Sequence, residues 1–196
     1  MSRYRRLCVF CGSNTGKSAI YAERTRELAR TLAQARIGIV YGGGTIGLMG
    51  VLADEALAHG GEVIGVIPHG LAVREVAHQG LTELRVVRSM HERKATMAEL
   101  SDGFVALPGG YGTFEELFEI VTWAQLGMHA KPVAILDADD YYAPLIEFLE
   151  RATDAGFVRA ENRRLLLHAR SVDELLGALE AYDPPVVTKW IDREST

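Results

Sequence analysis

Residues 104–119 read FVALPGGYGTFEELFE and hold the strongest local signal in the chain. Four apolar residues lead into a proline and three glycines, and a helical pattern with two adjacent carboxylates, Glu115 and Glu116, starts after Thr113. This order predicts a strand, a tight turn and a helix start. Glycines let backbone amides approach a ligand, and a helix N-terminus presents unpaired N–H groups. The turn therefore predicts a phosphate site, and the acids beside it indicate chemistry at a neighbouring sugar.

The same order of strand, glycine-rich turn and helix occurs twice nearer the N-terminus. The first unit spans 7–35 with its turn at 12–16, and the second spans 37–59 with its turn at 42–45. Further strands are predicted at 62–67, 83–87 and 132–136, further helices at 91–101, 142–155 and 172–181, and a mobile polar connection at 69–80. This alternation predicts one Rossmann-like α/β domain over 1–196, with three α/β/α layers and a parallel sheet of about six or seven strands. All three turns then lie at the carboxyl ends of strands, where such sheets bind ligands.

Charge and composition exclude several classes of function. The net charge of −5 and pI of about 5.7 show no basic surplus for binding nucleic acid. No apolar run approaches the ~20 residues of a membrane span, and the first residues lack the apolar core of a signal peptide. Cys8 and Cys11 lie on a predicted strand with opposite orientations, so we expect reduced structural thiols. We therefore expect a cytoplasmic protein that binds neither nucleic acid nor membrane.

Two glycine motifs have competing interpretations. Residues 42–47, GGGTIG, match the dinucleotide-binding pattern, but the next strand ends in Val66, Ile67 and Pro68 without the ribose-binding acid, and Glu62 lies at its wrong end. Glycines that serve only tight strand–helix packing are the other alternative. Residues 11–18, CGSNTGKS, resemble a triphosphatase loop but have cysteine in place of the first glycine. A triphosphatase is therefore disfavoured, whereas Ser13 stays open between a ligand contact and a plain polar loop.

Two cations near the predicted helix at 91–101 are placed against the preference of a helix start for negative charge. Arg93 and Lys94 therefore indicate an anionic partner, with a solvated pair bonded to Glu92 or Glu99 as the alternative. His91 is not followed by a second histidine at ligand spacing, so no metal site is predicted.

The acids after the glycine turn also have a purely structural interpretation. Thr113 and Glu116 have the spacing of a capping box, in which Thr113 would be the N-cap residue. A cap explains neither the glycine-rich lead nor the second carboxylate, so we favour a functional role.

Together, the motifs HERK (91–94) and PGGYGTFEE (108–116), with VYGGG (40–44) and GLMG (47–50), resemble the LOG ("lonely guy") family of cytokinin riboside 5′-monophosphate phosphoribohydrolases. The likeness extends over residues 8–190. It implies hydrolysis of the N-glycosidic bond of AMP or N6-isopentenyl-AMP, giving the free base and ribose 5-phosphate, without cofactor or metal. A broad nucleotide 5′-monophosphate nucleosidase and a non-catalytic nucleotide or pterin-cofactor carrier are the alternatives.

The resemblance also implies which residues act. Arg93 and Glu116 are the implied catalytic pair. The implied substrate contacts are Glu75, Lys94, Gly110, Tyr111, Gly112, Thr113, Glu115 and Thr122, and the glycine turns add Ser13, Gly43 and Gly109. The family further implies a homodimer, for which one predicted helix offers an apolar surface: Leu117, Phe118, Val121, Trp123 and Leu126.

Overall fold

The computed structural model describes residues 3–72 and 77–185, which form one seven-stranded sheet. The strand order is β4-β3-β2-β1-β5-β6-β7, and all neighbouring strands are parallel. The strands are β1 (Arg6–Phe10), β2 (Gly38–Tyr41), β3 (Val63–Pro68), β4 (Glu83–Val87), β5 (Gly103–Ala106), β6 (Val133–Leu136) and β7 (Leu166–Ala169). The predicted parallel sheet is confirmed.

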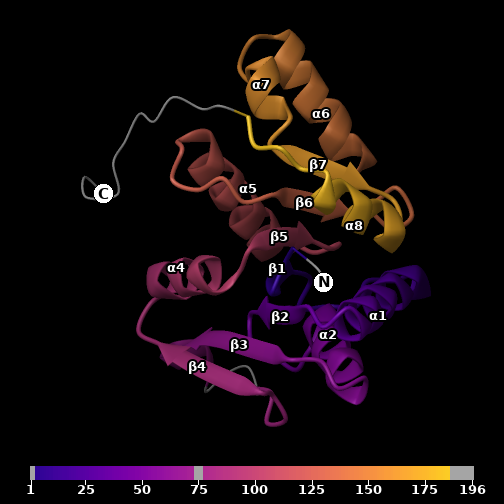
Figure 1. The fold of residues 1–196 in the computed structure, drawn as a ribbon, viewed down its shortest axis with the longest axis vertical. Helices are drawn as coiled ribbons and strands as arrows, with labels where there is room; N and C mark the ends of the chain where they lie inside the picture. The colour runs from indigo at the N-terminus through magenta and orange to yellow at the C-terminus, as the bar shows by residue number, and fades with distance from the viewer. Residues whose placement is uncertain (1–2, 73–76, 186–196) are drawn as a thin grey trace.

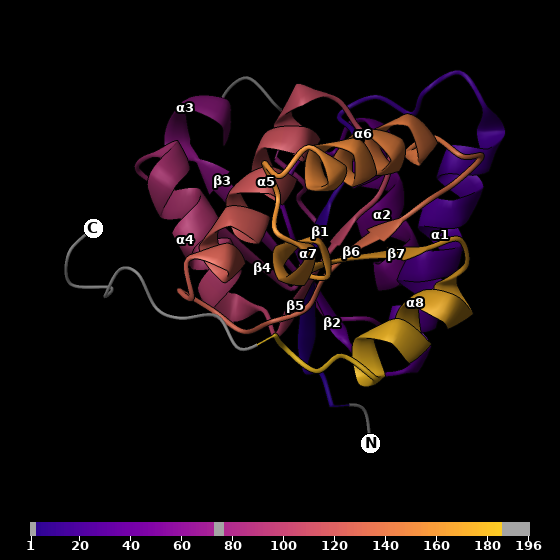
Figure 2. The same cartoon turned by 90° about the horizontal axis from the view of Figure 1, so that it is seen from above.

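Helices cover both faces of this sheet, which confirms the three layers (Figures 1 and 2). One face packs against α1 (Ala19–Gln34), α2 (Gly47–Ala58) and α8 (Val172–Glu180). The other face packs against α4 (Met90–Leu100), α5 (Tyr111–Gln125) and α6 (Ala143–Asp154). Two short helices, α3 (His69–Ala72) and α7 (Ala160–Arg163), lie in connections.

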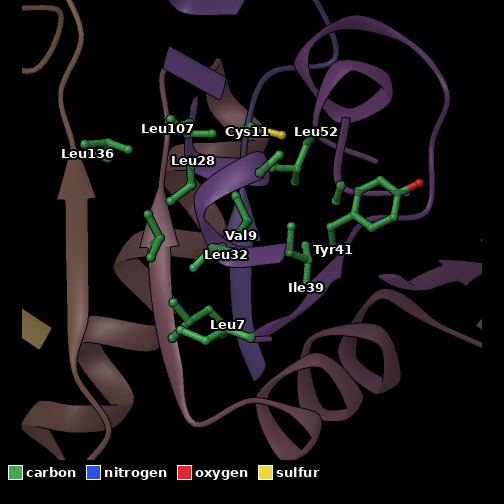
Figure 3. Packing of buried hydrophobic residues seen from close by; sticks show 14 of the residues in the cluster. Leu7, Val9, Cys11, Leu28, Leu32, Ile39, Tyr41, Leu52, Leu107 and Leu136 are labelled. Atoms are coloured by element: carbon green, nitrogen blue, oxygen red, sulfur yellow. The ribbon is translucent and has the colours of Figure 1, made fainter. Parts of the chain in front are cut away.

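The central strand β1 shows how the two cores form. Leu7 and Val9 point into the cluster shared with α1 and α2, which Figure 3 shows from close by. Phe10 points into the opposite cluster. Cys11 belongs to the first cluster and Cys8 to the second, so the two free thiols face opposite sides as predicted. Burial raises the pKa of both thiols, which suits packing rather than reactivity.

Helix α1 shows how the sequence pattern produces the packing. Its buried residues Thr25, Leu28 and Leu32 recur at spacings of three and four residues and form one stripe against the sheet. Burying each leucine contributes about 1.5–3 kcal/mol. The helix ends where Arg36 adopts a positive φ of 58° and the Ile37 amide donates to the Leu32 carbonyl (2.9 Å). This left-handed ending directs the chain into β2.

The order of the strands creates a crevice beside β1. From β1 the chain steps outward to β4, and it then returns to place β5 on the other side of β1. The turn after β1 leads into α1 on one face, whereas the turn after β5 leads into α5 on the opposite face. The two turns therefore diverge and leave room between them at the carboxyl ends of the strands.

Some elements differ from those expected. Strand β7 was not among the strands predicted one by one, and α3 and α7 were not predicted. The connection at 69–80 begins with α3, and its far end is bonded to the second glycine turn, because Ala77 forms an antiparallel bridge with Gly44 and the His78 amide donates to Gly43 (3.1 Å). Glu75 lies outside the described residues.

Candidate active site at the glycine turns

Three glycine turns meet at the carboxyl ends of β1, β2 and β5. The Gly12 amide donates to the Pro108 carbonyl (3.0 Å), and the Leu48 amide donates to the Gly12 carbonyl (3.0 Å). Gly47 has a φ of 63°, and a Cβ there would lie 2.2 Å from the carbonyl carbon of Ser13. Only glycine permits such an approach. The three turns therefore form one rim, as predicted.

A pocket of about 270 Å³ opens between the first and third turns. Its walls are the turns at 12–16 and 108–110 and the side chains of Tyr21, Leu48 and Tyr141. Among the described residues that line it, none is acidic or basic. Ser13 lies in this wall, so an anion bound here would depend on backbone amides and hydroxyl groups.

Helix α5 begins directly at the third glycine turn. Gly110 is its N-cap residue, and the Phe114 amide makes the first helical bond, to the Gly110 carbonyl (3.1 Å). No partner within residues 3–72 and 77–185 accepts from the amides of residues 109–113. These five N–H groups form the donor set that the sequence predicted for a phosphate.

The structural alternative, a capping box at Thr113, is wrong. The helix starts two residues before Thr113, and the Thr113 side chain is buried against the turn, where a Cβ on Gly109 would lie 2.1 Å from its hydroxyl oxygen. Thr113 is thus unable to act as N-cap. Glu116 instead points across to α4.

A cap related to a capping box is present at the start of α4, where Ser89 is the N-cap residue and Glu92 reaches back to the residue before it. The Glu92 amide donates to Ser89 Oγ (3.1 Å), and Glu92 Oε2 accepts from the Arg88 amide (2.7 Å). This engages Glu92, so it does not neutralise Arg93 or Lys94. The alternative of a solvated pair is also wrong, because the side chain of Lys94 is only 9% exposed.

Arg93 and Glu116, the predicted catalytic pair, lie together. Arg93 Nη2 is 3.4 Å from Glu116 Oε1, and both side chains are 11% exposed. Arg93 Nε donates to the Val66 carbonyl at the end of β3 (3.1 Å). A Cβ on Gly42 would lie 2.3 Å from Arg93 Nη2, so the glycine after β2 makes room for the guanidinium. The two helices thus hold an acid and a cation at the rim of the sheet.

Burial changes the acid–base behaviour of Glu116. Desolvation raises its pKa above the ordinary value of 4.5, although nearby Arg93 opposes this by favouring the carboxylate. Glu115 and Glu119 act in the same direction as burial. A carboxyl group whose pKa is raised in this way is suited to proton transfer nearer to neutral pH.

Lys94 forms a second link between α4 and α5. Its Nζ lies 2.5 Å from Glu115 Oε1 and 2.9 Å from Glu119 Oε2. Burial lowers the pKa of Lys94, but the bonds to Glu115 and Glu119 outweigh burial and raise it overall. The predicted substrate contacts Lys94 and Glu115 are therefore paired with each other.

The other predicted contacts differ in their positions. Gly43, at φ 78°, packs beneath Ile67 and shapes the second turn. Tyr111 and Gly112 open α5, and the Tyr111 side chain is 94% exposed. Thr122 does not join the rim, because it lies nine residues beyond Thr113, about 14 Å along the helix. Its hydroxyl donates to the Phe118 carbonyl (2.7 Å).

Sequence reasoning missed three residues of the site. Tyr21 and Tyr141 reach the pocket from α1 and from the connection after β6, and Gly42 receives the Arg93 guanidinium. Two adjacent tyrosines, 141 and 142, directly after a predicted strand were the sequence feature that could have indicated Tyr141.

Within the described part of the chain, no cluster of three or more His, Cys, Asp or Glu residues is arranged to hold a metal. None of the described helices has the length and apolar character to cross a membrane.

Comparison with known proteins identifies the family. A family model described as "possible lysine decarboxylase" matches residues 49–179. Cytokinin riboside 5′-monophosphate phosphoribohydrolase LOG7 of Arabidopsis thaliana is 50% identical over 184 residues, covering 93% of this chain and 84% of that protein. The chain belongs to the LOG family. LOG of Oryza sativa subsp. japonica, which carries the same enzyme name, is 49% identical over 93% of this chain and 76% of its own length.

Solved structures show that the LOG fold is shared more widely. The molybdenum cofactor carrier protein of Chlamydomonas reinhardtii has a TM-score of 0.67 at 20% identity, with 91% of this chain and 97% of that chain covered. The molybdenum cofactor binding protein of Rippkaea orientalis has a TM-score of 0.66 at 17% identity, over 92% of this chain and 98% of that chain. At such identities the likeness concerns the fold alone.

Proposed function

We propose that this LOG-family chain hydrolyses the N-glycosidic bond of AMP or N6-substituted AMP and releases the base and ribose 5-phosphate. The observation that carries the proposal is the buried Arg93–Glu116 pair beside a turn whose amides are available to an anion. Close relatives named cytokinin riboside 5′-monophosphate phosphoribohydrolases support the choice of substrate. We propose that the predicted contact residues that line the rim bind the substrate in this same site.

The 5′-phosphate binds at the start of α5 in this proposal. The free amides of residues 109–113 donate to its oxygens, and the positive end of the helix favours its charge. Ser13 contributes from the facing turn. Because this grip is remote from the glycosidic bond, it positions the sugar for the reacting groups.

The reaction takes place beside Glu116. Breaking the glycosidic bond gives the sugar an oxocarbenium-like charge, which a neighbouring carboxylate stabilises. Glu116 in its ionised form supplies that charge and accepts a proton from the attacking water, whose oxygen bonds to the anomeric carbon. The base departs with the electron pair of the glycosidic bond, and its uptake of one proton balances the proton that water gives up. Arg93 orients Glu116 and places a cationic donor beside the departing base. Glu115, one residue away and more exposed, holds the ribose hydroxyls.

A product assay tests this function. Purified protein is incubated with AMP, N6-isopentenyl-AMP, CMP and GMP, and the free base is measured by chromatography. Base release from the two adenine nucleotides, faster than from CMP or GMP, is expected. Folded protein that releases no base from either adenine nucleotide refutes the proposal, and tight binding without product would point to a carrier. Equal rates on all four nucleotides would point to a broad nucleosidase.

Glu116→Gln separates chemistry from structure. The amide keeps the size of the side chain but neither carries charge nor accepts a proton, so kcat should fall by roughly 100-fold or more while AMP still binds. Glu99→Gln, on the exposed side of α4, is the matched control and should retain full activity. If Glu116→Gln kept its kcat and lost only stability, the role of Glu116 would be structural.

We also propose a homodimer that uses the exposed side of α5. Phe118 is 36% exposed there, and Val121 and Trp123 are only partly covered by the core, whereas Leu117 is fully buried and unavailable. Because Thr122 is exposed on α5 and about 14 Å from the rim, we propose that any contact it makes with substrate lies in the site of the partner copy. Sedimentation at micromolar concentration tests this, and a monomer would refute it.

Two free buried thiols support the further proposal of a cytoplasmic location, which cell fractionation tests.

A further inference from the structure

Two adjacent tyrosines reach across the rim to the third glycine turn. Tyr141 and Tyr142 lie in the connection between β6 and α6. The Tyr142 hydroxyl donates to the Leu107 carbonyl (2.8 Å), and the Tyr141 hydroxyl donates to the Gly109 carbonyl. Neither tyrosine is among the residues that the mechanism uses.

These bonds complete a row of fixed carbonyls along the turn. Between the two, the Pro108 carbonyl accepts from the Gly12 amide (3.0 Å). Three consecutive carbonyls, those of Leu107, Pro108 and Gly109, are therefore held by three different donors. In a planar trans peptide the C=O and the following N–H point in opposite directions. The Tyr141 hydroxyl, which holds the Gly109 carbonyl, thereby sets the direction of the Gly110 amide. The Gly12 amide, which holds the Pro108 carbonyl, likewise sets the direction of the Gly109 amide.

The connection that carries the tyrosines is itself held in place. Asp137, which is 2% exposed, accepts from the Tyr142 amide (3.1 Å) and lies 3.2 Å from His168 Nε2 on β7. The Tyr141 ring packs edge-on against Tyr142 and Tyr21, at centroid distances of 5.0 and 5.8 Å. Burial raises the pKa of both hydroxyls, so each remains a protonated donor. Tyr141 therefore presents a prearranged donor to the turn.

We propose that Tyr141 is a positioning residue that fixes the Gly109–Gly110 peptide so that the Gly110 amide faces the phosphate of the substrate. The inference rests on the proposed function, since it assigns the phosphate to this turn. Gly109 and Gly110 lack side chains that would resist rotation of their shared peptide. Without the Tyr141 hydroxyl, that peptide can turn its carbonyl toward the phosphate and repel it.

Tyr141→Phe tests the proposal, with Tyr4→Phe as the matched control. Tyr4 also donates its hydroxyl to a backbone carbonyl, that of Leu179, but it lies before β1, at the amino ends of the strands and away from the glycine turns. Calorimetry measures the Kd of AMP and of ribose 5-phosphate, and the product assay measures KM and kcat. Tyr141→Phe should raise both Kd values and KM by roughly fivefold to tenfold, the equivalent of one hydrogen bond, with kcat within about twofold. Tyr4→Phe should change melting temperature alone.

The two proposals fail in different ways. If the unchanged protein binds ribose 5-phosphate and releases no base, the proposed function fails, and the Kd of Tyr141→Phe still tests the positioning role. If the unchanged protein is active and Tyr141→Phe has the same Kd and KM, the positioning role is refuted alone. A fall in kcat at unchanged KM also refutes it, because the hydroxyl would then act in the chemistry rather than in phosphate binding.

Discussion

Replacing Gly42 by alanine is expected to disable the proposed catalytic pair, Arg93 and Glu116, while the fold survives. A Cβ at this position would lie 2.3 Å from Arg93 Nη2, and ordinary contact begins at 3.4 Å. The guanidinium must therefore move by the difference, 3.4 − 2.3, or about 1.1 Å. Because the clash is with the end of a flexible side chain and not with backbone, the side chain yields rather than the sheet.

This displacement breaks the arrangement that holds Arg93. Its Nε is bonded to the Val66 carbonyl at 3.1 Å, and its Nη2 already lies 3.4 Å from Glu116, so a shift of this size removes at least one of these contacts. Misplacement of a catalytic group by about 1 Å lowers rates by roughly 100-fold. We expect kcat of Gly42→Ala to fall by about 10- to 100-fold. The loss of stability should stay near 1–3 kcal/mol, the cost of an impaired buried hydrogen bond.

The assay compares kcat for base release from AMP with the melting temperature of the same preparation. Gly177→Ala is the matched control, because Gly177 lies inside α8 and no atom lies within 4 Å of the added Cβ. That variant should be about 0.5–1 kcal/mol more stable and fully active. Folded Gly42→Ala with kcat within twofold of the unchanged protein would show that the position of Arg93 does not limit the reaction.

Three further substitutions test the acid, the helix start and the core. The pKa of Glu116 is raised above its ordinary value of 4.5, so protonated Glu116 contributes to stability at low pH. This contribution is lost as pH rises from about 4.5 through the pKa of the folded state. Thermal unfolding should therefore show the unchanged protein losing stability relative to Glu116→Gln over this pH range. Equal pH profiles would contradict the raised pKa. Ser89→Ala removes the acceptor for the Glu92 amide and should lower the free energy of unfolding in urea by about 1 kcal/mol. An unchanged free energy of unfolding would show that this cap does not stabilise α4. Leu32→Ala should cost about 2–5 kcal/mol with activity per folded molecule unchanged, and a loss below 1 kcal/mol would contradict its placement in the core.

The local parts of the fold could be predicted because each leaves a short-range pattern. Apolar runs of four to six residues give the strands, and glycine-rich turns after them give the rim. Strand β7 was missed since the short apolar run around its start, 165–167, follows two arginines and precedes a histidine, without a glycine or proline to mark the start. The capping-box alternative at Thr113 could not be excluded by spacing for a related reason. Both Ser89 and Thr113 have the required spacing, and Thr113 is excluded by the earlier start of α5 and by its burial against Gly109.

The non-local parts of the site could not be predicted from spacing. Arg93 is positioned by Gly42 and Val66, which lie 51 and 27 residues earlier in the chain. Tyr141 comes to the glycine turn only because β6 pairs beside β5. The sequence of each segment favours its own helix or strand, but the contacts among segments depend on the order of the strands. The sequence therefore indicated functional residues such as Arg93, but it could not indicate which residues they contact in the fold.

The pairing between α4 and α5 explains how acids can lie beside the proposed phosphate site. Glu115, Glu116 and Glu119 would together place three negative charges near the incoming nucleotide. Lys94 contacts two of them and Arg93 the third, so the five side chains carry a net charge of −1 when all are ionised. Because phosphate repulsion falls with local charge, the cations of α4 assist binding without contacting the phosphate themselves. Lys94→Met should therefore weaken binding of ribose 5-phosphate more than binding of ribose, a difference that calorimetry can measure and that a direct role of Lys94 in the chemistry does not require.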